Sequence, residues 1–124
     1  MSYCRWSTDD FLCDFYIYAI GDDEVVIHVA TSRLEYLEPL PPPVLLKADM
    51  SNWDAYVARK KVVDGMMRTA KKLPIGLPHD GEDYTLSYRD AASKVRELIA
   101  LGYRCDPAVA DRLEADAPLE QELP

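Results

Sequence analysis

The chain has 124 residues and a formal net charge of −8, with 22 acidic residues against 14 lysines and arginines. This length supports one hydrophobic core of ordinary size, and a hydrophobic content of 48% is typical of a globular protein. Binding to phosphates requires a surplus of lysine and arginine, so the composition argues against a direct nucleic-acid partner and favours a protein partner with a basic surface.

The charge is unevenly distributed along the chain. Residues 51–79 carry a net charge of +4, whereas residues 1–50 and residues 80–124 each carry −6. A basic element is therefore expected between two acidic ones.

Three cysteines, Cys4, Cys13 and Cys105, are irregularly spaced and form no C-x-x-C pair. An odd number of unpaired cysteines is typical of a reduced intracellular protein, so we expect packed free thiols and no metal or other cofactor. The N-terminus does not resemble a signal peptide, and no apolar run is long enough to cross a membrane. These features predict a cytoplasmic protein with no membrane partner.

Residues 13–30 predict an antiparallel β-hairpin, because apolar and polar residues alternate on both sides of a Gly21-Asp22-Asp23 turn. In the register that separates the two faces, Ile20 pairs with Glu24, and a glycine or aspartate of the turn takes a positive φ. The apolar face then holds Phe15, Ile17, Ala19, Val25, Ile27 and Val29. The opposite face holds Asp14, Tyr16, Tyr18, Glu24, Val26 and His28.

A proline-rich segment follows, with Pro39 and Pro41–Pro43 in five positions, and predicts an extended connector. Ser51 or Asn52 is then expected to cap a helix that runs to Pro74. Its apolar stripe predicts the main core helix, packed on the hairpin, and comprises Trp53, Tyr56, Val62, Val63, Met66, Met67 and Ala70. Arg68, Lys71 and Lys72 are expected in its last turn, against the negative end of the helix dipole.

The segment 74–86 contains two prolines and two glycines and is interpreted as a loop. Ser87 and Asp90 predict a capped second helix with Ala91, Val95, Leu98 and Ile99 on one face and Gly102 as its C-cap. Asp106 and Pro107 predict a short third helix. Residues 1–117 are thus expected to form a single domain, followed by a frayed acidic tail, 118–124.

Two places carry candidate functional residues. The polar face of the hairpin and its turn present tyrosines among acids, a composition suited to binding a basic protein; these residues are Asp14, Tyr16, Tyr18, Asp22, Asp23, Glu24 and His28. The alternative is that another part of the chain covers this face. In the loop 74–86, His79, Asp80, Glu82 and Asp83 suggest a metal-dependent hydrolase, but a hydrogen-bonded turn is the simpler interpretation. We predict no catalytic residue and no metal ligand.

The opening MSYCRWSTDDFLCDFYIY, the later HVA and the loop IGLPHDGE together resemble a group of small phage and prophage accessory proteins that begin with a similar M-S-Y-C-R-W stretch. This resemblance covers the hairpin and the loop, and it brings no catalytic residues to carry over. It implies a viral accessory role in the host bacterial cell, of the kind that inhibitors of host defence such as anti-CRISPR proteins perform.

The expected fold is therefore α+β, an N-terminal antiparallel hairpin packed against about three α-helices. The expected function is stoichiometric inhibition of a host defence system by binding to a basic host protein, for example a CRISPR effector subunit. A small metal-dependent hydrolase that uses the His79-Asp80 loop and a phage structural or packaging accessory protein remain alternatives.

Overall fold

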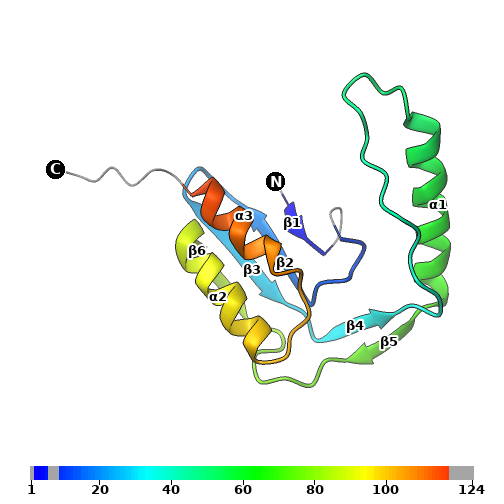
Figure 1. The fold of residues 1–124 in the computed structure, drawn as a ribbon. Coiled ribbons are helices and arrows are strands. Elements are labelled where there is room, and N and C mark those ends of the chain that lie inside the picture. The colour runs from blue at the N-terminus through cyan, green and yellow to red at the C-terminus, as the bar shows by residue number, and fades with distance from the viewer. Residues whose placement is uncertain (1, 6–8, 118–124) are drawn as a thin grey trace. The chain divides into compact units, whose positions relative to one another are not determined.

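A four-stranded antiparallel sheet with strand order β1-β2-β3-β6 organises the larger part of the chain (Figure 1). The computed structural model describes residues 2–5 and 9–117. The sheet consists of β1 (Ser2–Cys4), β2 (Phe15–Ala19), β3 (Glu24–Val29) and β6 (Asp83–Ser87). The class is therefore α+β, as predicted.

The predicted hairpin register is confirmed. Phe15 pairs with Val29, Ile17 with Ile27, and the Ile20 amide donates to the Glu24 carbonyl at 3.1 Å. The predicted apolar face is buried, with Ala19 only partly covered. The turn differs in one respect, because none of its three residues takes a positive φ.

Strand β6 corrects the loop interpretation of residues 74–86. Asp83–Ser87 pairs antiparallel with β3, so that Val25 lies opposite Leu86 and Ile27 lies opposite Tyr84. The chain reverses just before β6 through Gly81, whose φ of +80° is one that residues with a side chain rarely adopt.

Helices α2 (Tyr88–Ala100) and α3 (Ala108–Asp116) cover one face of this sheet (Figure 1). The predicted start of α2 is confirmed, because the Ser87 hydroxyl accepts the Asp90 amide at 3.1 Å. The side chain of Asp106 likewise accepts the Ala108 amide at the start of α3. Ala91, Val95 and Leu98 of α2 are fully buried and form the core together with the hairpin.

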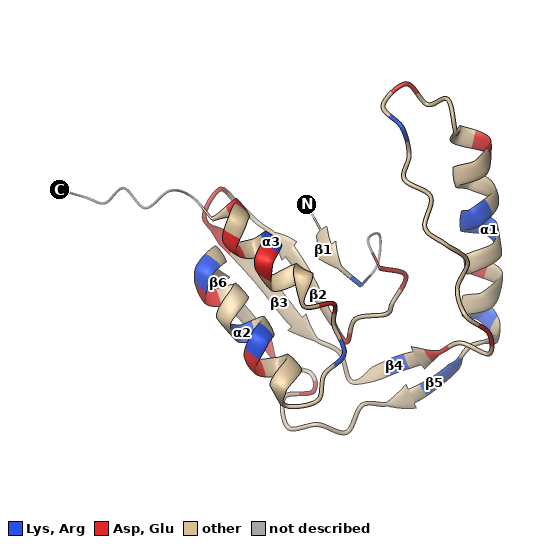
Figure 2. Cartoon of the chain, viewed as in Figure 1, with Lys and Arg blue, Asp and Glu red and all other residues tan. Residues whose placement is uncertain are grey.

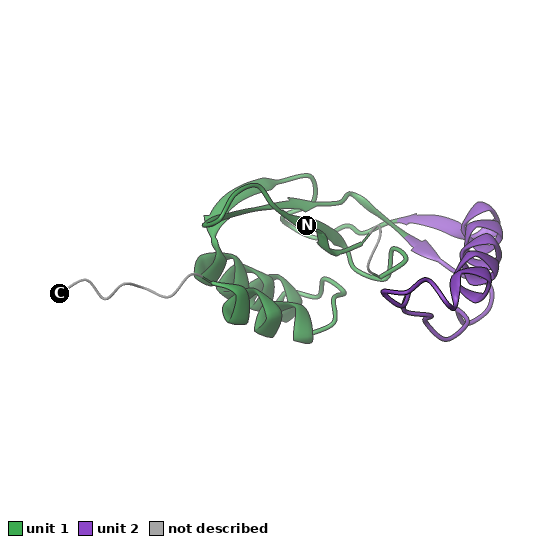
Figure 3. Ribbon diagram, turned by 90° about the horizontal axis from the view of Figure 1, so that it is seen from above, with its two compact units in different colours: residues 1–33, 74–124 green, residues 34–73 purple. Residues whose placement is uncertain are grey.

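Residues 34–73 form a second compact unit, while residues 1–33 and 74–124, which include the first two residues of β4 and the last residue of β5, form the first (Figure 3). Strands β4 (Ser32–Glu35) and β5 (Lys71–Pro74) form a two-stranded sheet, and α1 spans Trp53–Thr69. The single domain predicted over residues 1–117 stays a prediction, because two compact units do not by themselves define two domains. The tail predicted at 118–124 lies outside the described residues.

The prediction of α1 as the main core helix is wrong. Of its residues only Val63 is buried, while Trp53 and Val62 are about half exposed. The helix also ends at Thr69, so Lys71 and Lys72 lie in β5 instead of its last turn. An apolar stripe indicates that one side of a helix packs against another element, but it does not identify that element as the sheet of the first unit.

The start of α1 also differs from the prediction. Asn52 precedes the helix, but its side chain makes no capping hydrogen bond. Asn52 instead accepts the Lys47 amide through Oδ1 and donates to the Leu45 carbonyl through Nδ2, and it thereby closes the preceding loop.

No helix in the described ranges 2–5 and 9–117 combines the length and the apolar character needed to cross a bilayer.

Candidate functional site

The sheet face opposite α2 and α3 is the surface that the sequence predicted for binding. Burial alternates along β3 and β6, so Glu24, Asp83 and Ser87 are exposed while their neighbours face the core. Tyr18 on β2 is 43% exposed. This face is therefore not fully covered by the rest of the first unit.

Acidic side chains gather at one end of this face. Asp22 and Asp23 in the β2–β3 turn and Glu24 at the start of β3 are all exposed, and the turn appears as an acidic tip (Figure 2). Farther along the face, His28 binds Asp83 on the neighbouring strand. The structure thus brings together most of the predicted residues.

Tyr16 is less available than predicted. The Arg5 guanidinium lies 5.1 Å from the centre of its ring, and Phe11 packs edge-on against it with ring centres 6.4 Å apart. The centre of the His28 ring lies 6.0 Å from that of the Tyr16 ring. Tyr16 is consequently half buried, and Tyr18 is the better candidate for contact with a partner.

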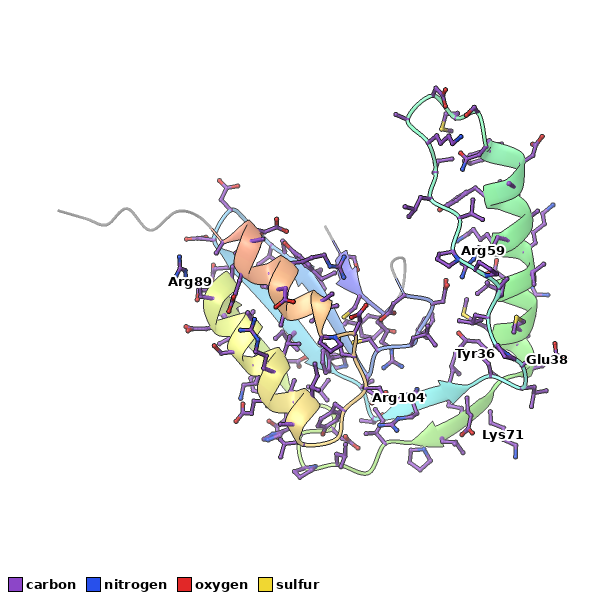
Figure 4. All side chains as sticks on the ribbon, in the orientation of Figure 1. Tyr36, Glu38, Arg59, Lys71, Arg89 and Arg104 are labelled. Atoms are coloured by element: carbon purple, nitrogen blue, oxygen red, sulfur yellow. The ribbon has the colours of Figure 1, made fainter. Side chains whose placement is uncertain are left out.

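The prediction of Asp14 as a surface residue is wrong. Asp14 precedes β2 and has no exposed surface. Its Oδ2 accepts hydrogen bonds from Arg33 Nη2 at 2.6 Å and from the Arg104 amide at 2.7 Å. Arg104 belongs to the connection between α2 and α3 (Figure 4). The alternation of buried and exposed residues along β2 begins at Phe15 and does not extend to Asp14. The Asp14 carboxylate instead links the start of the hairpin to the connection between α2 and α3.

A cluster of three thiols lies elsewhere in the first unit. The Sγ atoms of Cys4, Cys13 and Cys105 all lie within 4.8 Å of one another, although β1, the segment before β2 and the α2–α3 connection supply them separately. Cys4 and Cys13 are buried with Sγ atoms 3.1 Å apart, and Cys105 is partly exposed. Irregular spacing concealed this cluster, which we call the thiol triad.

The pKa values of the thiol triad are driven apart by mutual hydrogen bonding. The Cys105 pKa falls to about 5, because its thiolate accepts hydrogen bonds from Cys13 and Cys4. Burial raises the pKa of Cys13, and the contact with Cys105 raises that of Cys4. The arrangement therefore favours one thiolate held by two thiols, and thiolate is the form that reacts and binds metal.

The chain between Cys4 and Cys13 has unusual backbone geometry. Arg5, Asp10 and Phe11 have φ values of 85°, 52° and 66°, a region that residues other than glycine rarely occupy. Asp9 lies in the same segment, and burial raises its pKa to about 6. Its Oδ1 atom is buried and has no hydrogen-bond partner within the described part of the chain.

The His79 loop is a hydrogen-bonded turn. Asp80 Oδ2 accepts the Gly76 amide at 2.8 Å, while Asp80 Oδ1 accepts the Tyr103 hydroxyl at 2.9 Å. His79 Nδ1 lies 3.0 Å from Glu82 Oε1. Both oxygens of Asp80 are thus engaged in holding the loop, an arrangement that supports the turn interpretation over a hydrolase.

The second unit offers a cavity of about 220 Å³ lined by Leu37, Glu38, Met66 and Thr69. Figure 4 labels Glu38 on the chain after β4 and Arg59 on α1. Arg59 donates hydrogen bonds to the carbonyls of Pro41 and Pro42, so it fastens the proline-rich connector to the helix. Among the described residues that line this cavity, Glu38 is the one with a titratable side chain, and together they form no constellation suited to catalysis.

No known protein family, curated protein or solved structure matches the chain. Inferences about function therefore rest on the geometry of the chain itself.

Proposed function

We propose that the chain is a phage-type accessory protein that inhibits a host defence system by binding stoichiometrically to a basic surface of a host effector, such as a CRISPR effector subunit. It would act in the cytoplasm of the host cell. The observation that carries the proposal is the exposed sheet face, on which Tyr18 lies on the strand that leads to the acidic β2–β3 turn.

The charge of the first unit supports a basic partner. Residues 1–33 and 74–124 together carry a net charge of −10, whereas residues 34–73 carry +2. A surface that normally holds nucleic acid is rich in lysine and arginine, so an acidic protein competes for it directly. Asp22 and Asp23 project at the tip of the hairpin and are placed to steer this encounter.

Tyrosine supplies the contact area that charge alone lacks. When an exposed tyrosine contacts a partner, its ring buries a large apolar area while its hydroxyl keeps a hydrogen bond. Such residues often contribute most of the binding energy. Tyr18 lies opposite Val26 on the neighbouring strand. Together they form a small apolar centre on a face whose borders are acidic, the arrangement typical of a protein interface.

A competition experiment tests the proposal. The full chain is titrated into a purified CRISPR effector complex while binding of its target nucleic acid is measured. We expect binding to be lost at a fixed molar ratio, because the inhibitor occupies the site and does not turn over. The variant Asp22→Lys/Asp23→Lys is expected to inhibit much less well.

A matched control separates local charge from net charge. Glu35→Lys/Glu38→Lys makes the same change in net charge at two exposed acids of the second unit. This control is expected to inhibit like the wild type. Unaffected target binding at excess inhibitor contradicts the proposal, and so does equal loss of inhibition in both double variants.

A further inference from the structure

We propose that the thiol triad is a binding site for one zinc ion. This inference is independent of the binding function proposed above, and it replaces the expectation of packed thiols without a metal. It rests on the convergence of three sulfur atoms from segments far apart in the sequence.

The spacing of the sulfurs fits a single ion. Zinc binds cysteine sulfur at about 2.3 Å with tetrahedral geometry, which places two sulfurs on one ion about 3.8 Å apart. The three Sγ atoms lie within 4.8 Å of one another, so small side-chain movements bring all three into contact with one ion. Thiolates are soft ligands that favour zinc over calcium or magnesium.

Asp9 carries a carboxylate on the segment between Cys4 and Cys13. Its Oδ1 is buried without a hydrogen-bond partner among the residues described, and a carboxylate oxygen is an ordinary zinc ligand. The Asp9 oxygens are not among the ligand atoms that lie within 4.8 Å of one another, so the geometry assigns the three sulfurs alone to the ion. The left-handed conformations of Asp10 and Phe11 bend the segment that carries Asp9.

The surroundings offset the negative charge of such a site. Three thiolates exceed the charge of one zinc ion, and nearby cations reduce the cost of that excess. The Arg5 side chain, directly after Cys4, is buried, and Arg112 Nη2 donates to the carbonyl of Tyr3, directly before Cys4, at 3.2 Å. The three sulfurs come from β1, the segment before β2 and the α2–α3 connection, so a bound zinc ion would join these segments.

Metal analysis of the full chain, purified under reducing conditions and dialysed with zinc, tests this inference. We expect one zinc ion per chain, and we expect cobalt in place of zinc to give the intense near-ultraviolet absorption of thiolate coordination. Asp9→Asn and Asp10→Asn keep all three sulfurs and are expected to bind zinc like the wild type, whereas Cys105→Ser tests the loss of a sulfur.

The cysteine variant is chosen so that folding does not obscure the result. Cys105 is partly exposed, so Cys105→Ser should fold while losing the metal, as circular dichroism and metal content measure together. Wild-type protein that retains three titratable thiols and takes up neither zinc nor cobalt overturns the inference. A disulfide between Cys4 and Cys13 in the native protein, or full zinc content in Cys105→Ser, also overturns it.

Discussion

Arg33 donates a hydrogen bond from Nη2 to Oδ2 of Asp14 over 2.6 Å, and the carboxylate that accepts it has no exposed surface. Arg104 approaches the other carboxylate oxygen, with Nε 3.5 Å from Oδ1. The pair therefore lies where the hairpin, β4 and the α2–α3 connection meet within the first unit. Asp14 therefore holds these segments together. The sequence pattern had instead assigned Asp14 to a binding surface.

The first prediction concerns this buried carboxylate. Asp14→Ala removes a fully buried carboxylate and leaves the partly exposed Arg33 guanidinium without its partner. Removing one member of a buried ion pair typically costs about 3–5 kcal/mol of unfolding free energy. Urea denaturation followed by circular dichroism measures the change. Asp22→Ala, at an exposed acid of the hairpin turn, is the control and should differ from wild type by less than about 0.5 kcal/mol. Equal effects would contradict the assignment of Asp14 as structural.

The second prediction distinguishes the two units by their burial. Ile27 is fully buried under α2, so Ile27→Ala should lower the unfolding free energy by about 2–5 kcal/mol. Met67 in α1 is only partly covered, so Met67→Ala should lower the unfolding free energy clearly less than Ile27→Ala does. Val62→Ala, at a half-exposed position, is the control and should change the unfolding free energy by less than about 0.5 kcal/mol. A large loss at Met67 would show that α1 is buried more deeply than the structure indicates.

The features that the sequence predicted correctly depend on near neighbours in the chain. The alternation of residues 15–29 determined the hairpin register, because only one pairing separates apolar from polar side chains. The Ser87 hydroxyl and the Asp90 amide fixed the start of α2 in the same local way. In both cases the interacting groups lie within a few residues of a recognisable turn or cap.

The features that were missed depend on distant contacts. Strand β6 was hidden by the prolines and glycines before it, although Tyr84 and Leu86 do alternate with polar residues and gave a usable signal. The thiol triad had none, because Cys105 comes close to Cys4 and Cys13 only when the α2–α3 connection packs near β1. The stripe of α1 likewise indicated an apolar side without identifying what covers it.

The third prediction follows from the buried phenol that holds the His79 loop. Burial, together with the hydrogen bond to Asp80, raises the pKa of Tyr103 from 10 to about 12. The folded protein thus retains this proton more tightly than the unfolded chain. The associated stability is fully present below pH 10 and is lost as the pH rises towards about 12. The urea concentration at the midpoint of unfolding should therefore fall as the pH is raised from 10 to about 12.

Two controls connect this alkaline effect to Tyr103. In Tyr103→Phe the fall attributable to this phenol should disappear, although the variant is less stable at neutral pH because Asp80 and the His79 amide each lose a hydrogen bond. Tyr18→Phe removes an exposed phenol and should keep the wild-type profile. An unchanged alkaline profile in Tyr103→Phe would contradict the assignment.

The last prediction separates the two roles proposed for the exposed sheet face. Charge reversal at Asp22 and Asp23 should mainly slow association with the effector and flatten its dependence on salt, because loop charges act before contact is made. Tyr18→Ala should instead speed dissociation and weaken binding by about 2 kcal/mol or more, because an anchoring ring acts after contact. Surface plasmon resonance at several salt concentrations resolves the two rates.

Both variants should remain folded, since these residues are exposed and lie outside the core. Thr85→Ala on β6 is the matched control for Tyr18→Ala: it lies on the same face, opposite Val26, but removes little contact area. Its dissociation rate should stay close to that of the wild type, because a small side chain contributes little as an anchor. If Tyr18→Ala and Thr85→Ala dissociate like the wild type while charge reversal abolishes binding, charge alone sustains the complex and the tyrosine is no anchor.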